Sequence, residues 1–231
     1  MRVSQSIWLE YTKILRGLNE TAVAKVKGYL SKHKISSDAD FRALIEYAHA
    51  VATKYGEGSA ALAGEMYNKI ALAEGKVIAG AEAAETATMP EVAKAVTGTM
   101  EAGNDDLVAN SVGRLVKMAG ADTVIKNAVR DHAEFAWIPQ GAETCAFCMT
   151  LASEGWQPAS KVAINGGHAT HIHANCDCMY AIRFRNDTSY DGYDPGRYKR
   201  IYNNAEGNTS REKINSIRRM LYAQNKEDAG E

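Results

Sequence analysis

All four cysteines of this 231-residue chain, and two of its six histidines, lie in two short segments, TCAFC at 144–148 and HIHANCDC at 171–178. The two segments are separated by 22 residues, and cysteine occurs nowhere else. A chain that used cysteine only as a small apolar residue would distribute it. Clustered cysteine and histidine are typical of a metal site, and a small module can gain much of its stability from the bound metal.

The spacing is C-x2-C, then H-x-H-x2-C-x-C. Two cysteines separated by two residues can direct both sulfur atoms to one point, as tetrahedral Zn²⁺ requires. Our preferred ligand set is Cys145, Cys148, His173 and Cys176, with Cys178 as the substitute for Cys176. The sequence therefore predicts one structural zinc ion held by two segments of chain.

Other interpretations of the cluster stay open. His171 brings the candidates to six for four ligand positions, and His168 lies just before it in a glycine-containing segment. Two disulfides would form in oxidising surroundings, and a cysteine beside a histidine is also what a thiol nucleophile needs. The start MRVSQSIWLE does not resemble a signal peptide and no apolar run is long enough to span a membrane, so we expect a reducing cytoplasm during folding and no membrane partner.

Helical spacing of apolar residues dominates the first part of the chain. Capping residues, Gly and Pro90 divide this part into separate expected helices. The segments are 7–18, 36–58, 59–75, a helix beginning at Pro90, 104–120 and 121–137. We therefore assign residues 1–137 to a helical scaffold.

The remaining chain has a different pattern. MYAIRF at 179–184 alternates as a strand does, and the Tyr-rich segment 186–204 is expected to be an ordered loop with a short helix. A final helix is predicted by a capping box at Thr209 and Glu212, and by an apolar stripe formed by Ile214, Ile217 and Leu221. The fold class is α+β, with a Cys/His module at 138–205 and an amphipathic helix with an acidic tail at 206–231.

Charge is unevenly distributed along a chain whose net charge is −1. Residues 1–34 carry seven Lys and Arg against two acids, and residues 180–226 carry ten against five. Basic ends permit contact with acidic partners. In the final helix the candidate partner-binding residues are Arg211, Lys213, Arg218 and Arg219.

The segments IPQGAETCAFCMTLASEGW and HANCDC resemble a motif of the MuF-like head-morphogenesis, or minor capsid, proteins of tailed bacteriophages. KYGEGSAALAGEMYNKI and YDGYDPGRYKRIYNN extend the resemblance to the variant found in phages of Gram-positive hosts. The family motif matches Cys145, Cys148, His173, Cys176 and Cys178 and leaves out His171.

The resemblance implies a non-enzymatic protein present in few copies in the phage head, near the portal vertex, after assembly in the host cytoplasm. It implies as partners the portal protein, the major capsid or scaffolding protein, and packaged DNA. Two other functions remain as alternatives: a zinc-stabilised nucleic-acid-binding module, and a nuclease-like enzyme that would use His173, Tyr180 and Arg183.

Overall fold

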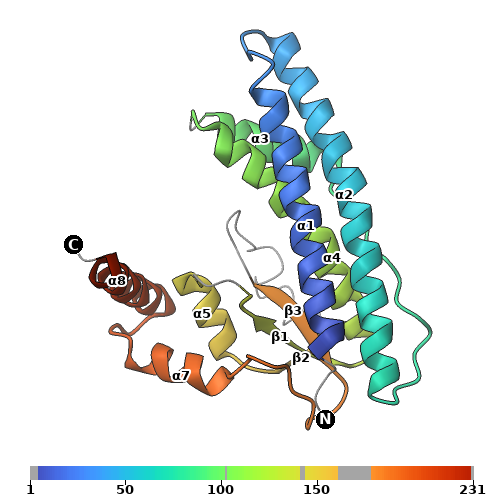
Figure 1. The fold of residues 1–231 in the computed structure, drawn as a ribbon, viewed down its shortest axis with the longest axis vertical. Coiled ribbons are helices and arrows are strands. Elements are labelled where there is room, and N and C mark those ends of the chain that lie inside the picture. Colours follow the sequence, from blue (N-terminus) through green and yellow to red (C-terminus); the bar gives the residue numbers. More distant parts are fainter. Residues whose placement is uncertain (1–4, 102, 141–143, 161–177, 230–231) are drawn as a thin grey trace.

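The structure is a computed structural model that describes residues 5–101, 103–140, 144–160 and 178–229. Long helices form most of it, and a small antiparallel sheet packs near one end of them (Figure 1). The fold is α+β, as the sequence predicts. The helices are α1 (Gln5–Leu30), α2 (Asp38–Ala73), α3 (Met89–Met100), α4 (Asp105–Arg130), α5 (Ala146–Ser153), α7 (Pro195–Asn204) and α8 (Ser210–Ala229), and the strands are β1 (Glu134–Ile138), β2 (Gln157–Pro158) and β3 (Met179–Arg183).

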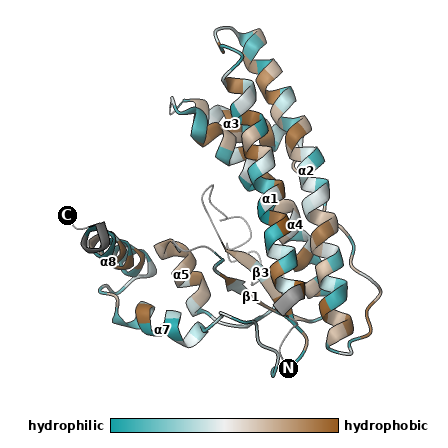
Figure 2. Cartoon of the chain, in the orientation of Figure 1, coloured by the Kyte–Doolittle hydropathy of each residue, from teal (hydrophilic) through white to brown (hydrophobic). Residues whose placement is uncertain are grey.

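Helices α1, α2 and α4 pack side by side as the scaffold, and α3 packs on α2 and α4 (Figure 1). Brown, hydrophobic residues and teal, hydrophilic residues alternate along α1 and α2 in Figure 2, as expected for amphipathic helices. One core cluster lies among the four helices and includes Leu44, Val92 and Val112. A second cluster, with Tyr67 and Ile182, joins the scaffold to the sheet.

Two helices are longer than the sequence predicts. The expected break near Gly56 is wrong because α2 continues to Ala73, and the expected break at Gly120 is wrong because α4 continues to Arg130. Both glycines lie where another part of the chain approaches closely. A Cβ atom at Gly120 would lie 2.6 Å from the Ser59 hydroxyl oxygen, and one at Gly56 would lie 3.0 Å from a Thr86 methyl carbon. These glycines allow close packing and do not end the helices.

The prediction of helix as far as Trp137 is also wrong. His132 has a positive φ of 55°, which ends α4, and the Ala133 N–H donates to the Ala128 carbonyl at 2.9 Å. This is the Schellman arrangement that commonly ends helices, here with histidine in the left-handed position that glycine usually takes. The chain then turns directly into β1.

Strand β1 is central in the sheet, which has the order β2-β1-β3 and is antiparallel throughout. Trp137 lies opposite Tyr180 in the β1–β3 register. The strand expected at 179–184 is confirmed as β3. The sequence-based boundary between residues 137 and 138 falls inside β1. The sheet and the scaffold share one hydrophobic core.

Residues 76–88, here called the strap, connect α2 to α3 without regular secondary structure. Side chains of α4 hold its backbone. The Asn127 side chain accepts from the Glu82 N–H at 2.9 Å and donates to the Glu82 carbonyl at 2.8 Å, and the Thr123 hydroxyl accepts from the Ala84 N–H at 2.9 Å. These backbone polar groups of the strap are therefore satisfied although no strand pairs with them.

Helix α8 packs on α5 and α7, apart from the scaffold (Figure 1). The predicted capping box is present: the Glu212 carboxylate accepts from the Thr209 N–H at 3.0 Å, and the Thr209 hydroxyl accepts from the Glu212 N–H at 3.2 Å. The predicted apolar stripe is confirmed, with Ile217 buried and Ile214 and Leu221 packed around it in a small separate core.

The Tyr-rich segment is ordered and contains α7, as expected. Its tyrosines tie it to the sheet and to α5, because the Tyr190 hydroxyl donates to the Ile182 carbonyl at 2.5 Å and the Tyr193 hydroxyl donates to the Ala152 carbonyl at 3.1 Å. In the part of the chain that the structure describes, no helix combines the length and the apolar character needed to cross a bilayer.

Candidate metal centre and binding surfaces

The C-x2-C pair lies at the N-terminus of α5. Cys145 is the N-cap residue, and its sulfur accepts a hydrogen bond from the Cys148 backbone N–H at 3.3 Å. Cys148 is fully buried, one turn into the helix. A backbone N–H that donates to a cysteine sulfur at a helix N-terminus favours the thiolate, which is the form that binds metal. The first half of the predicted ligand set therefore has a geometry that suits zinc.

Cys178 occupies a different environment. It is buried directly before β3 and lines a small space of about 20 Å³ together with Tyr11 and Leu15 of α1. No disulfide joins Cys145, Cys148 and Cys178 to one another. Among residues 5–101, 103–140, 144–160 and 178–229, no three Cys, His, Asp or Glu side chains form a group that could hold a metal ion. Cys178 thus does not complete a three-ligand group with the α5 pair.

The remaining ligand candidates, His173 and Cys176, lie outside the described residues, as do His168 and His171. Of the predicted zinc ligands, the structure therefore describes Cys145 and Cys148 at the start of α5 and Cys178 before β3. When bound, a zinc ion would supply structural stability by linking α5 to the chain that enters β3.

Arg183, named for the nuclease-like alternative, is engaged in packing. Its Nε atom donates to the Glu134 carboxylate at 2.6 Å, and its guanidinium carbon lies 4.7 Å from the centre of the Trp156 ring. Tyr180 is buried in the core. The Arg183 side chain links β3 to Glu134 of β1 and to Trp156, and the Tyr180 side chain packs inside the core.

The four predicted partner-binding residues of α8 divide into two groups. The Lys213 ammonium donates to the carbonyls of Tyr202 at 3.1 Å and Ala205 at 3.3 Å, so it caps the C-terminus of α7. Arg219 lies 4.0 Å from Glu206, at a solvent-exposed position where an ion pair contributes little. Arg211 and Arg218 remain exposed.

Two further exposed residues extend the surface formed by Arg211 and Arg218. Tyr222 and Lys226 follow Arg218 at four-residue spacings, and the Lys226 ammonium lies 5.6 Å from the centre of the Tyr222 ring. Residues at this spacing share one face of a helix, so we call Arg211, Arg218, Tyr222 and Lys226 the α8 stripe. The four-residue spacing of Arg218, Tyr222 and Lys226 is the signal of this stripe in the sequence.

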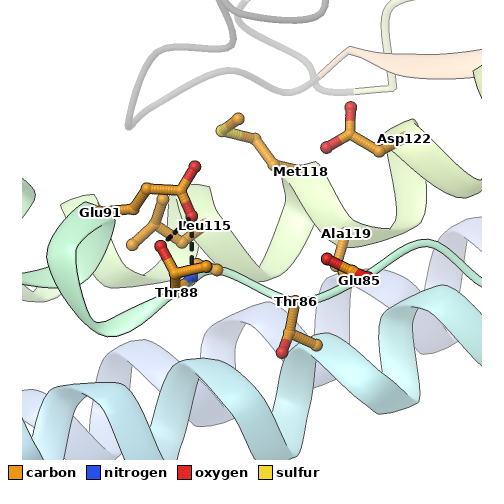
Figure 3. Close-up of a pocket in the computed structure, with 9 residues that line it drawn as sticks. Glu85, Thr86, Thr88, Glu91, Leu115, Met118, Ala119 and Asp122 are labelled. Atoms are coloured by element: carbon orange, nitrogen blue, oxygen red, sulfur yellow. Dashed lines mark hydrogen bonds between the residues drawn. The ribbon is translucent and has the colours of Figure 1, made fainter.

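A pocket that sequence reasoning missed lies where the strap, α3 and α4 meet (Figure 3). It encloses about 190 Å³ and has carboxyl groups from Glu85, Glu91 and Asp122 in its lining. In Figure 3, Met118 projects between Glu91 and Asp122. Three acids on three different elements produce no pattern in the sequence, so only the packing reveals them.

The two principal carboxyl groups of this pocket differ in their proton affinity. The Glu91 carboxylate accepts from the Thr88 N–H at 2.7 Å and from the Thr88 hydroxyl at 2.8 Å, and these hydrogen bonds lower the pKa of Glu91. Burial, reinforced by the negative charge of Glu91, raises the pKa of Asp122 to about 6. Asp122 is thus the group in this pocket that gains a proton in mildly acidic solution.

Fold and site together define an α+β protein with a helical scaffold, a small antiparallel sheet and a cysteine pair at a helix N-terminus. Residues 2–205 match the family described as VG15 protein, and the chain belongs to this phage-associated viral gene family. No curated protein and no solved structure matches the chain. The match ends before α8, so the α8 stripe lies outside the matched residues.

Proposed function

We propose that the chain is a minor structural protein of a tailed-phage head, present in few copies near the portal vertex, where it assists head assembly or the handling of packaged DNA. The observation that carries the proposal is membership of a phage-associated family over residues 2–205, in a chain whose α5 segment resembles the MuF-like motif. The proposal assigns no catalytic step to the protein. It places the protein in the virion, after assembly in the host cytoplasm.

A structural zinc ion is part of the proposal. Cys145 and Cys148 would provide two ligands and His173 and Cys176 the other two. Such an ion would fix the position of α5 relative to the chain entering β3. Helix α8 packs on α5, so its position would be fixed as well. The module would then present α8 at a defined angle to its partner.

Zinc content and thermal unfolding test this part. We expect about one zinc ion per chain in protein purified under reducing conditions. Cys145→Ser should lose the metal while keeping the N-cap, because serine is itself a favoured N-cap residue. A chelator should therefore lower the melting temperature of the wild-type chain and leave that of Cys145→Ser unchanged. Wild-type protein that contains no zinc and does not respond to the chelator would refute the metal site.

The α8 stripe is the proposed recruiting surface. Its three cations lie on one exposed face, and the apolar face of α8 is used for packing on α5 and α7. An acidic surface of the portal protein or of a capsid or scaffolding protein would complement these charges, and arginine can bind carboxylates in a bidentate way. Because the stripe is not part of the core, its substitution should affect binding and not folding.

Incorporation into phage heads tests the proposed location. Combined Arg211→Glu and Arg218→Glu should reduce incorporation, or binding to isolated portal protein, and leave the melting temperature within about 1 °C, because exposed charges contribute little to stability. Lys94→Glu on α3 is the matched control, an exposed lysine on the scaffold. Absence of the wild-type protein from purified heads would refute the proposed function. Normal incorporation of the double variant would refute only the recruiting surface.

A further inference from the structure

Three aromatic rings form a column near the turn between α1 and α2. This turn lies at the end of the scaffold remote from α5 and α8 (Figure 1). The Tyr29 ring stacks on the His33 ring with centroids 4.1 Å apart and planes at 16°, and on the Tyr47 ring with centroids 4.4 Å apart and planes at 21°. Two rings cannot lie so close to the same face of Tyr29 without overlapping. His33 and Tyr47 therefore cover opposite faces, and Tyr29 is the middle ring.

Hydrogen bonds hold both ends of this column. The Tyr47 hydroxyl donates to the Lys25 carbonyl at 3.3 Å, and His33 Nδ1 donates to the Tyr29 carbonyl at 2.9 Å. His33 is exposed, whereas Tyr29 and Tyr47 are half-buried. The column thus ends in an aromatic ring whose orientation is fixed and whose outer side faces solvent.

Lysines lie beside the column. Lys32 and Lys34 flank His33 in the sequence, and Lys25 lies one helical turn before Tyr29, where its carbonyl accepts the Tyr47 hydroxyl. Within the residues that the structure describes, none of these three lysines forms an ion pair, whereas Lys27 pairs with Asp106 at 2.8 Å. The nearest acids of the turn in sequence are Asp38 and Asp40. Asp40 accepts hydrogen bonds from Ser36 and Ser37, and among the described residues Asp38 forms no ion pair with these lysines. Three positive charges therefore remain available beside the column.

We propose that this turn binds single-stranded nucleic acid, with an unpaired base stacked on His33 and phosphates held by Lys25, Lys32 and Lys34. Ring stacking combined with unpaired lysines is the chemistry with which proteins bind single strands without sequence preference. An acidic protein would use the lysines alone, and a duplex would not present an open base face. This site is separate from the α8 stripe and goes beyond the proposed role in head assembly.

Binding of an oligonucleotide of about 12 nucleotides, a length within the range such sites cover, tests the inference. The oligonucleotide carries the fluorescent adenine analogue 2-aminopurine, whose emission falls when it stacks, and binding to the full chain is followed by anisotropy. His33→Ala should weaken binding about tenfold and abolish the stacking signal, whereas His33→Phe should retain both. Combined Lys32→Gln and Lys34→Gln should weaken binding, and the slope of log affinity against log salt should fall by about 0.7 for each phosphate that the variant no longer binds.

Lys199→Gln on α7 is the matched control, because this exposed lysine lies on a different part of the fold and its replacement should leave affinity unchanged. Circular dichroism of each variant measures its folding, and His33→Phe separates the ring from the imidazole hydrogen bond. The inference is overturned by any of three results: duplex binding as tight as single-strand binding, wild-type affinity in folded His33→Ala, or no binding at low salt. The first two results would indicate that the turn binds polyanions in general. The third would indicate that the stacked rings only stabilise the packing of α1 on α2.

Discussion

Replacing Asp122 by Asn should stabilise the protein at neutral pH and have no effect in acid. Among the described residues Asp122 makes no hydrogen bond or ion pair, and it shares its pocket with the ionised Glu91 (Figure 3). Because its pKa rises from the ordinary 3.8 to about 6 in the folded chain, the folded state binds this proton more tightly than the unfolded state does. The ionised carboxylate is therefore destabilising.

The pH window follows from these two values. Below pH about 4 both states are protonated and the penalty is absent, between pH 4 and 6 it grows, and above pH 6 it is complete. A shift of about two pKa units corresponds to about 3 kcal/mol, at about 1.4 kcal/mol per unit. Asp122 keeps partial contact with water, which screens its charge, so we expect a gain of about 1–2 kcal/mol for Asp122→Asn at pH 8.

Thermal unfolding followed by circular dichroism between pH 4 and pH 8 measures the effect. In a chain of this size the gain corresponds to a rise in melting temperature of about 3–6 °C at pH 8, which disappears by pH 4. Glu57→Gln is the control for loss of one negative charge, because Glu57 is an exposed carboxyl on α2, and its effect should be small at every pH. A gain that does not change with pH, or no gain at pH 8, would show that the buried charge is not the cause.

Three further predictions concern packing and buried polar groups. Asn127→Ala should destabilise the fold by about 2–3 kcal/mol in denaturant unfolding, because both backbone groups that it holds in the strap lose their partner; a change below about 0.5 kcal/mol would mean that water replaces it. Gly120→Ala should cost about 1–2 kcal/mol because its Cβ would collide with α2, whereas Gly17→Ala, with nothing within 4 Å, should add about 0.5–1 kcal/mol; equal effects at the two sites would contradict this view of the helix packing. Glu134→Ala should cost about 2 kcal/mol by leaving the half-buried Arg183 without its carboxylate, and the cost should shrink when Arg183 is also replaced by Met.

The sequence alone was sufficient for features that depend on near neighbours in the chain. The start of α8 at the Thr209–Glu212 capping box, the start of α3 beside Pro90 and the strand at 179–184 agree with the structure. Each of these depends on hydrogen bonds, fixed φ angles or side-chain alternation within a few residues. The C-x2-C pair is equally local, and its placement at the start of α5 brings one sulfur to a backbone N–H three residues later.

Features that depend on distant contacts could not be predicted in this way. Gly56 and Gly120 have the residue type that ends helices, yet they lie inside α2 and α4, at positions where Thr86 and Ser59 approach closely and leave little room for a side chain. The capping role of Lys213 could not be predicted either, because the carbonyls to which it donates belong to the end of α7 and to the residue after it.

The sequence by itself therefore determined where α3, α8 and β3 begin, which helices are amphipathic, and the spacing of the cysteine pair. Only the tertiary structure decided that α2 and α4 are continuous, that the strap lies on α4, and that Glu91 and Asp122 share a pocket. The physical reason is the range of the interactions. A capping hydrogen bond spans about one turn of chain, whereas close packing and the burial of a charge depend on which distant segments meet.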